Sequence, residues 1–441
     1  MEKGLHFMFY DESMADPIFS PDGQFMWTGA EWIPAPPSQS QSANVNLHDS
    51  VIVGDVNITQ NNAEDIVTAM VQALERLGFS GQSSPAELTP SQTKEVEQVL
   101  EKSEQIAEIG MEIPPWTEVT LGTAARYAGH NDIAIRNYSR ALEKFRKNSD
   151  REGEATSLNN LGHIEQTRGA LAEAEQLYRE SLAIRGEIGD RQGEAASLNN
   201  LGIIAATRGD LAEAEQLYRE SLTIKREIGD RQGEAVSLNS LGNIATTRGD
   251  LAEAERLQRE SLAITREIGD RQGEAPYLNN LGNIAIERGD FAEAEGLYRE
   301  SLAIEREFGD REGEASSLSN LGIIAETRGD LAEAEQLNRE SLAIRREIGD
   351  RKGEASSLKN LGVIAKTRGA LAEAERLHRE SLAINIEIGY RKGEATSLHW
   401  LGNIAYMVGN VDEQHKCFTE ATRIWREIGI PIDQWFIDNG Y

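Results

Sequence analysis

Few side chains in this sequence could perform chemistry, and they do not gather into a recognisable constellation. The one cysteine, Cys417, occupies the place that Leu177 and Leu217 hold in the repeated pattern described below, which is typical of a small buried apolar residue. Only His399 and His415 approach the spacing of metal ligands, and they fall on two different predicted helices. The sequence carries no glycine-rich phosphate loop, activated nucleophile or carboxylate pair above background. We therefore expect no catalytic residue, no metal and no cofactor, and we expect that the protein is not an enzyme.

Asparagine is the polar residue that recurs at a regular interval. It stands at Asn160, Asn200, Asn280, Asn320 and Asn360. An amide can both donate and accept hydrogen bonds, which suits a sequence-tolerant grip on the backbone of an extended peptide. The alternative is that these amides bond to the neighbouring helix of the same protein.

These asparagines belong to a stretch of sequence that the chain repeats. The stretch runs from Asp150 to Gly189, and near-copies begin at Asp190, Asp230, Asp270, Asp310 and Asp350, with a diverging copy at Tyr390. A degenerate copy covers residues 111–149. Such a fixed period in a chain of 441 residues indicates one repeat array, in which each repeat buries its apolar face against its neighbours.

Each repeat is predicted to form two amphipathic helices. In the copy at Asp190, apolar and small residues recur at helical spacing over 193–209 and again over 211–229. Gly209 ends the first helix and Asp210 caps the second, with Glu213 in the capping-box place; Gly229 and Asp230 repeat the device between copies. The copies with Ala170 and Ala370 lack the capping aspartate, so we expect Ala370→Asp to stabilise the protein.

Small residues at fixed places let these helices approach one another closely, and the pattern resembles that of a known repeat family. The tetratricopeptide-repeat (TPR) signature is matched at Leu198, Leu201, Gly202, Ala214, Tyr218 and Ser221. The repeat departs from it by having no Trp at the Leu198 place, no terminal Pro and six extra residues. Its length is similar to that in the arrays of spindle-orienting adaptors and kinesin light chains. The resemblance implies an all-α fold, an α-solenoid of about eight helix-turn-helix repeats of 40 residues, and a binder of peptides or partner proteins.

A comparison of the copies separates a constant scaffold from a variable stripe on the first helix. The places of 156, 159, 163 and 166 differ most between copies, and their spacing of 3, 4 and 3 puts them on one helical face. The TPR resemblance implies that this face lines the concave groove of the array. The candidate partner-binding residues are Asn159, Asn160, His163, Asn199, Asn200, Asn239, Asn243, Asn279, Asn280, Asn283, Asn320, Glu326, Lys359, Asn360, Lys366, His399, Trp400, Asn403 and Tyr406.

The alternative is that exposed places drift freely. However, Glu213, Glu215, Arg219 and Glu220 on the second helix keep their residue types through the first six copies, and Glu215 and Arg219 have ion-pair spacing. If exposure alone produced variation, these places should vary too. The variation of the stripe therefore favours a surface that reads a partner.

The stripe changes character along the chain, from amides through Glu287 and Glu326 to Lys359 and Lys366, and finally to aromatic residues. We expect a mixed-charge peptide with an apolar anchor near the C-terminal end. Lys359 is followed by Val363 and then by Trp400, so the Lys/Asn clamp with which some TPR proteins hold a C-terminal carboxylate is not reproduced.

The net charge of −29 argues against nucleic acid and anionic membrane surfaces as partners. The simpler interpretation of this charge, which requires no specific partner, is that it keeps a long exposed surface soluble. The sequence has no signal peptide and no apolar run of the length that a membrane span needs, so we expect a cytoplasmic protein.

The segments outside the repeats are shorter and more varied. A hairpin with Trp27 and Trp32 is predicted within residues 1–35, with the two rings packing on each other or forming a docking patch. A Pro/Ser/Gln linker (36–44) leads to a strand-helix module (45–79), for which we hypothesise self-association into a homo-oligomer. A second linker (80–92) precedes a capping helix (93–110). After the degenerate repeat and the seven clear ones (150–429), a tail (430–441) carries Trp435, Phe436 and Ile437, which we expect to cover the last repeat or to bind a partner.

Two functions of different classes follow. The first is a non-catalytic adaptor whose array binds a partner peptide or protein. The second is a sensor or regulatory subunit in which the N-terminal module is the effector and the array responds to a ligand.

Overall fold

The computed structural model describes residues 25–27, 32–34, 63–79, 88–108 and 110–441. The described chain divides into two compact units, with the boundary between Ile188 and Gly189. We call them unit 1 and unit 2. The predicted linker at 36–44, the predicted strands between 45 and 58 and most of the linker at 80–92 lie outside the described residues.

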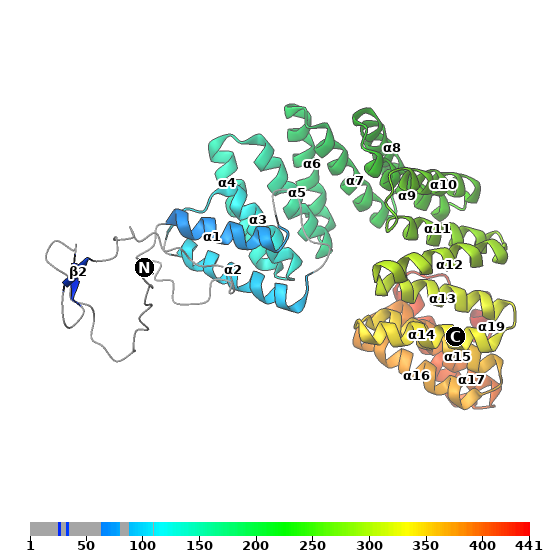
Figure 1. Ribbon diagram of the computed structural model, residues 1–441. Coiled ribbons are helices and arrows are strands. Elements are labelled where there is room, and N and C mark those ends of the chain that lie inside the picture. The colour runs from blue at the N-terminus through cyan, green and yellow to red at the C-terminus, as the bar shows by residue number, and fades with distance from the viewer. Residues whose placement is uncertain (1–24, 28–31, 35–62, 80–87, 109) are drawn as a thin grey trace, which may run out of the picture. The chain divides into compact units, whose positions relative to one another are not determined.

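Unit 1 contains a small hairpin and six helices among its described residues (Figure 1). Strands β1 (Phe25–Trp27) and β2 (Trp32–Pro34) pair antiparallel, with Trp27 opposite Trp32. The helices are α1 (Ala63–Arg76), α2 (Pro90–Glu108), α3 (Pro115–Tyr127), α4 (Asn131–Asn148), α5 (Arg151–Thr167) and α6 (Leu171–Ile188). The degenerate copy therefore forms a helix pair, α3 and α4, like the clear copy that follows it.

Unit 2 is a row of six helix pairs followed by a short tail helix, all within the described residues. Its helices are α7 (Arg191–Arg208), α8 (Leu211–Ile228), α9 (Arg231–Thr247), α10 (Leu251–Glu267), α11 (Glu274–Glu287), α12 (Phe291–Phe308), α13 (Arg311–Thr327), α14 (Leu331–Glu347), α15 (Arg351–Thr367), α16 (Leu371–Glu387), α17 (Arg391–Met407), α18 (Val411–Glu427) and α19 (Gln434–Asp438). With the two pairs of unit 1, eight pairs of the expected length are present. The all-α repeat architecture is confirmed.

The helix boundaries arise from aspartate and glycine at fixed places. Asp230 accepts a hydrogen bond from the backbone N–H of Gly233 at 2.8 Å, and Gly229 ends the preceding helix at a φ of 73°, where a side chain would be strained. Asp290 likewise accepts from the N–H of Glu293 at 3.0 Å. The cap expected at Asp210 is wrong in detail, because its side chain makes no capping hydrogen bond.

The two helices of a repeat pack closely because one glycine faces an aromatic ring. A Cβ atom on Gly282 of α11 would stand 2.6 Å from the ring of Tyr298 on α12, which is fully buried. The sequence indicates Ser301 only as a small packing residue, but its side chain also forms a hydrogen bond between the two helices. Its hydroxyl donates to the backbone carbonyl of Ala275 on α11 at 3.0 Å. The serines at the same place, Ser181, Ser221, Ser261, Ser341 and Ser381, make the corresponding bond in their own repeats.

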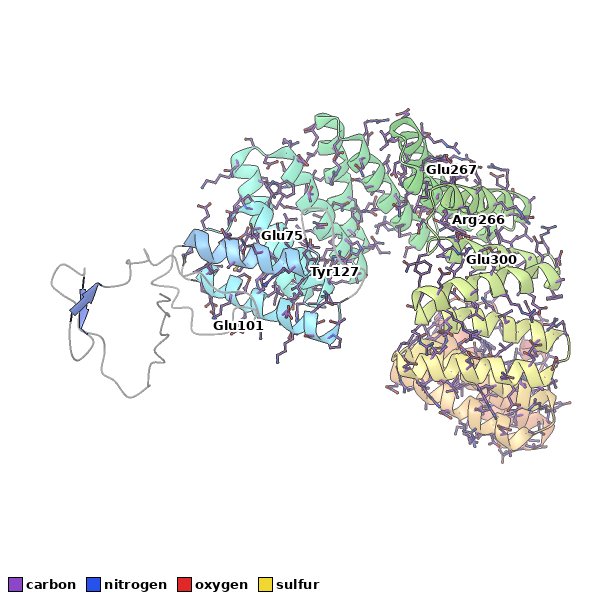
Figure 2. The ribbon with its side chains drawn as sticks, in the orientation of Figure 1. Glu75, Glu101, Tyr127, Arg266, Glu267 and Glu300 are labelled. Carbon is purple, nitrogen blue, oxygen red and sulfur yellow. The ribbon has the colours of Figure 1, made fainter. Side chains whose placement is uncertain are left out.

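Successive repeats within a unit are joined by arginine side chains that each hold two carboxylates. Arg266 of α10 donates to Glu274 of α11 at 3.0 Å and to Glu300 of α12 at 2.6 Å (Figure 2). The side chain of Glu274 is only 7% exposed, so its charge is compensated where water is scarce. Arg146 makes these contacts in unit 1, and Arg226, Arg306 and Arg346 make them in unit 2.

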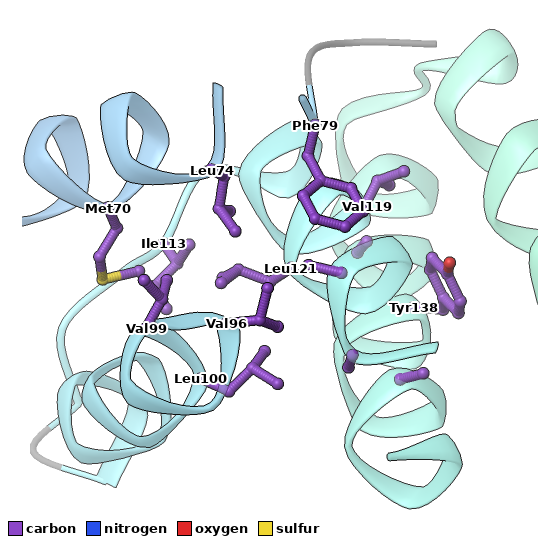
Figure 3. Close-up of a cluster of buried hydrophobic side chains, with 14 of the residues drawn as sticks. Met70, Leu74, Phe79, Val96, Val99, Leu100, Ile113, Val119, Leu121 and Tyr138 are labelled. Carbon is purple, nitrogen blue, oxygen red and sulfur yellow. The ribbon is translucent and has the colours of Figure 1, made fainter. Parts of the chain in front are cut away.

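The apolar face of α1 is buried inside unit 1. Met70 and Leu74 of α1 and Phe79 after it join a cluster with Val99 of α2 and Leu121 of α3 (Figure 3). Helix α1 is therefore part of the same core as the helix expected to cap the array. Self-association through residues 45–79 remains a prediction, and the helix face that suggested it is already covered within the chain.

The C-terminal tail returns to the last helix pair. Phe436 of α19 is 6% exposed, and its ring lies 5.2 Å from that of Phe418 and 5.7 Å from that of Trp425, both on α18. Trp435 and Ile437 remain 46% and 52% exposed. Of the three residues expected to cover the last repeat, Phe436 is thus the one that is buried.

Candidate interaction surface

The variable stripe lies on the accessible side of the first helix in each repeat of unit 2. At the place of Ile323, all six residues of the unit are exposed or half-buried, and Val236, Ile323 and Tyr406 are stripe residues with large apolar side chains that are 39%, 40% and 67% exposed. In unit 1 the stripe is described by α5, where His163 is exposed and Asn159 and Asn160 are half-buried.

The constant residues of the second helix are held by ion pairs. Arg219 of α8 pairs with Glu215 on its own helix at 2.5 Å, as the spacing predicts, and Glu215 also pairs with Arg248 of α9. These contacts give the constant face a structural reason to stay constant. The contrast with the stripe therefore does not by itself prove selection for binding.

Several of the predicted asparagines bond inside the protein. Asn280 donates to the amide oxygen of Asn239 on the preceding first helix at 2.8 Å, and Asn279 donates to Ser301 and Glu305 of α12, each at 2.9 Å. Asn360 is buried and donates to Asn338 of α14 at 3.2 Å. For Asn280 and Asn360 the alternative interpretation, a bond to a neighbouring helix, describes the structure. Asn199, Asn200 and Asn320 are half-buried on the same face.

A second set of stripe residues bonds to the second helix of its own repeat. The hydroxyl of Tyr298 donates to Asn283 at 2.7 Å, and the amide of Gln258 donates to Asn243 at 3.1 Å. In unit 1 Tyr178 donates to Gln166 at 2.8 Å. The residue at the Tyr298 place thus lies beneath the stripe and ties it to the scaffold.

The stripe becomes basic and aromatic on α15 and α17. Lys359 and Lys366 are half-buried, and the ammonium of Lys366 lies 4.8 Å from the ring centre of Trp400 on α17. Burial lowers the pKa of Lys359, and the negative charge of Glu326 on α13 opposes that change. Burial likewise raises the pKa of Glu326, against the charge of Lys359. Three neighbouring first helices therefore bring predicted residues together here.

His378 of α16 belongs to this cluster, although it was not among the candidate residues predicted from the sequence. It stands at the Tyr298 place, is fully buried, and its ring stacks on Trp400 with centroids 5.7 Å apart and an interplanar angle of 4°. Within the described residues neither of its ring nitrogens has a hydrogen-bond partner. Burial, together with the positive charges of Lys359 and Lys366, lowers its pKa to about 4. The replacement of the usual tyrosine was the signal that sequence comparison could have used.

The last repeat carries a pocket of about 550 Å³ beside this cluster. Three stripe residues of α17, Thr396, His399 and Asn403, line one side, and the lining is completed by Lys392, Trp425, Ile430, Pro431, Asp433, Trp435 and Phe436. His399 bonds to Asn403 at 2.9 Å, and burial lowers its pKa, with a further contribution from Lys366. Its ring lies 5.8 Å from that of Trp400, so the pocket and the lysine cluster share an edge.

Hollows of another kind lie between successive second helices of unit 2. One is floored by Leu342, Leu358 and Leu377 and rimmed by arginine and glutamate side chains that pair with one another. Two others repeat the same lining. Because the residues are the same in each repeat, these hollows offer little basis for specificity.

The described residues show no grouping suited to metal binding or to nucleophilic chemistry. No cluster of three or more potential ligands is present among them. Cys417 is buried, and that burial raises its pKa to about 11, which keeps the thiol protonated. None of the described helices is long and apolar enough to cross a membrane.

Sequence comparison finds one family across most of this chain. The model of the tetratricopeptide repeat matches residues 115–187, 155–227, 193–267, 233–307, 273–347 and 313–387. A search of curated proteins finds no match.

Among solved structures, the apo form of RapI is similar over 83% of this chain and 98% of its own, with 13% identity and a TM-score of 0.58. A signal-transduction ATPase with a tetratricopeptide-repeat sensor, from Pyrococcus horikoshii, is similar over 77% of this chain and 53% of its own, with 15% identity and a TM-score of 0.55. The quorum sensor NprR from B. thuringiensis, in its apo form, is similar over 82% of this chain and 98% of its own, with 12% identity and a TM-score of 0.53. At these identities the likeness concerns the fold.

Proposed function

Because the chain belongs to the tetratricopeptide-repeat family, whose repeat it carries from residue 115 to 387, we propose that it is a non-catalytic adaptor that binds a segment of a partner protein along the variable stripe of unit 2. The partner segment lies across the first helices and places an apolar side chain in the pocket of the last repeat. The partner is a protein or peptide, in keeping with the acidic surface of the chain.

The observation that carries this proposal is a pocket at the end of a stripe whose residues differ from copy to copy. On the opposite face the charged side chains form ion pairs, such as Arg219 with Glu215 and Arg266 with Glu274. The stripe exposes Val236, Ile323 and Tyr406, differs in sequence from copy to copy, and leads to a pocket lined by His399. Apolar area that folding leaves accessible beside a pocket is the usual material of a binding site.

The test is a selection of random displayed peptides on the full-length protein, followed by affinity measurements with the recovered sequences. Ile323→Arg places a charge on the stripe, and Ile348→Arg is its matched control, because both isoleucines are 40% exposed but Ile348 lies at the end of a second helix. We expect Ile323→Arg to weaken binding about tenfold or more and Ile348→Arg to leave it unchanged. Equal effects of the two substitutions, or a selection that recovers no peptide, would reject the proposal.

A sensor or regulatory role is the second candidate, and the names of two structural neighbours raise it. It uses the same surface and differs in what binding does. If the protein is a sensor, binding of a selected peptide should change the rate of amide hydrogen exchange in residues 63–79. If it is an adaptor, the exchange rate there should stay the same.

A further inference from the structure

Lys359 and Lys366 differ from the arginines of unit 2 in how their charges are compensated. Arg226, Arg266 and Arg306 each hold two carboxylates. Within the described part of the chain, neither Lys359 nor Lys366 makes an ion pair or a hydrogen bond, and Lys366 contacts the ring of Trp400. Two cations therefore stand without a bonded anion in a protein of net charge −29.

Their partial burial makes this arrangement costly for the free protein. Both lysines are half-buried, and a cation that has lost water without gaining an anion is destabilised. Glu326 acts on Lys359 through its charge but forms no ion pair with it. Acidic residues elsewhere on the surface contribute little, because at physiological ionic strength charges are screened over about 8 Å. Both cations have already lost part of their water in the free protein, so an anion that binds here has less water to displace.

The layer beneath the lysines is also incomplete. In the repeats of Tyr298 and Gln258, the polar end of this residue bonds to the stripe residue above it. At His378 the stripe offers Val363 and Lys366 instead, and the buried imidazole has no hydrogen-bond partner among the described residues. Both lysine charges act on this ring. The ammonium of Lys366 lies 4.8 Å from the ring centre of Trp400, which stacks on His378, and Lys359 lies two turns earlier on α15, about 10 Å away along the helix.

We propose that Lys359 and Lys366 of α15, with His378 beneath them and Trp400 of α17 beside them, form a subsite for one anionic group of the bound peptide, a carboxylate or a phosphate. This inference rests on the proposed function and names the chemistry of the partner. Trp400 joins the subsite to the pocket of His399. The partner segment therefore carries an acidic group at a fixed distance from its apolar anchor.

The test compares peptides selected by the wild-type protein with those selected by a Lys359→Gln/Lys366→Gln variant and by a Lys359→Glu/Lys366→Glu variant. Lys416→Gln, at an exposed lysine of α18, is the control. We expect peptides from the wild type and the control to be enriched in Asp or Glu at one position, the Gln variant to lose that enrichment, and the Glu variant to favour Lys or Arg there. Thermal unfolding of each variant verifies that the fold is retained.

Synthetic versions of one recovered peptide, with Glu, Gln or phosphoserine at the enriched position, identify the anion. The Gln peptide should bind the wild type about tenfold more weakly than the Glu peptide, and the two should bind the Gln variant alike. A phosphoserine peptide that binds as well as the Glu peptide assigns the subsite to phosphorylated partners, and weaker binding assigns it to carboxylates. Recovered peptides without acidic enrichment would overturn this inference and leave the proposed function intact. Recovery of no peptide would overturn both.

Discussion

Replacing Gly282 by alanine tests the packing that sets the distance between the two helices of a repeat. The new Cβ would stand 2.6, 2.8 and 2.9 Å from three ring carbons of Tyr298, well inside van der Waals contact. The ring has no free direction, because it is fully buried and its hydroxyl is bonded to Asn283 at 2.7 Å. The methyl group can therefore be accommodated only if α11 and α12 move apart.

Two opposing effects set the magnitude. Overpacking of this kind costs about 1–3 kcal/mol. Alanine is better than glycine in a helix interior by about 0.8–1.0 kcal/mol. The substitution should thus destabilise the protein by up to about 2 kcal/mol.

Gly296→Ala is the matched control in the same repeat. Gly296 lies inside α12, and a Cβ there would meet no atom within 4 Å, so only the helix-propensity gain of about 1 kcal/mol applies. Repeat arrays open locally, so hydrogen exchange of the α11 and α12 amides should be measured beside the urea midpoint. Exchange should become faster in Gly282→Ala and slower in Gly296→Ala. If both variants shift in the same direction, the argument from ring contact is refuted.

Three further substitutions have expected outcomes in unit 2. Ala370→Asp should stabilise α16 by about 1 kcal/mol, because Ala370 provides no side-chain cap. In the preceding repeat, Asp330 accepts a hydrogen bond from the backbone N–H of Glu333 at 3.2 Å. An unchanged urea midpoint would contradict this expectation. Ile386→Arg restores the arginine that Arg346 supplies one repeat earlier, opposite Glu394 and Glu420. It should raise the free energy of unfolding by up to about 1 kcal/mol at low salt and by less in 1 M salt. A salt-independent gain would point to another cause. His378→Asn should flatten the pH dependence of the free energy of unfolding. The pKa of His378 falls from 6.5 to about 4 on folding, so the unfolded state binds more protons between these two pH values. About 3 kcal/mol of stability is therefore lost in the wild type as the pH drops through that window. Identical pH profiles of variant and wild type between pH 7 and 4 would rule out this contribution.

The sequence predicted those features of the fold that depend on local pattern. The positions of Gly229 and Asp230 fix where helices end and begin, since a left-handed glycine and a capping side chain act on their own neighbours. The same places in each copy then predict the remaining helix pairs. The packing of α1 against α2 and α3 was not predicted, because the apolar face of α1 does not specify which surface covers it.

The accessibility of the stripe was predicted from the sequence, whereas its role as a binding surface stays a prediction. Stripe residues such as Ile323 and Tyr406 are accessible, as their variation indicated. The role of Asn279 depends on two residues of another helix, the constant Ser301 and Glu305, whose place varies between copies. His378 was missed for a related reason. Its importance comes from two lysines and a tryptophan on neighbouring helices, and no periodicity within one copy reveals that.

Because the arginine junctions between repeats are alike, a whole repeat can be removed or added while a junction of the same kind forms. Arg226 holds Glu234 and Glu260, and Arg266 holds Glu274 and Glu300 in the same way. Removal of residues 230–269 would bring Arg226 to Glu274 and Glu300 and leave an equivalent junction. A gain or loss of one repeat therefore keeps this arginine junction between the repeats that become neighbours, while it adds or deletes one row of stripe residues. Partner preference can thus change by duplication or deletion within the gene without a search for new packing solutions.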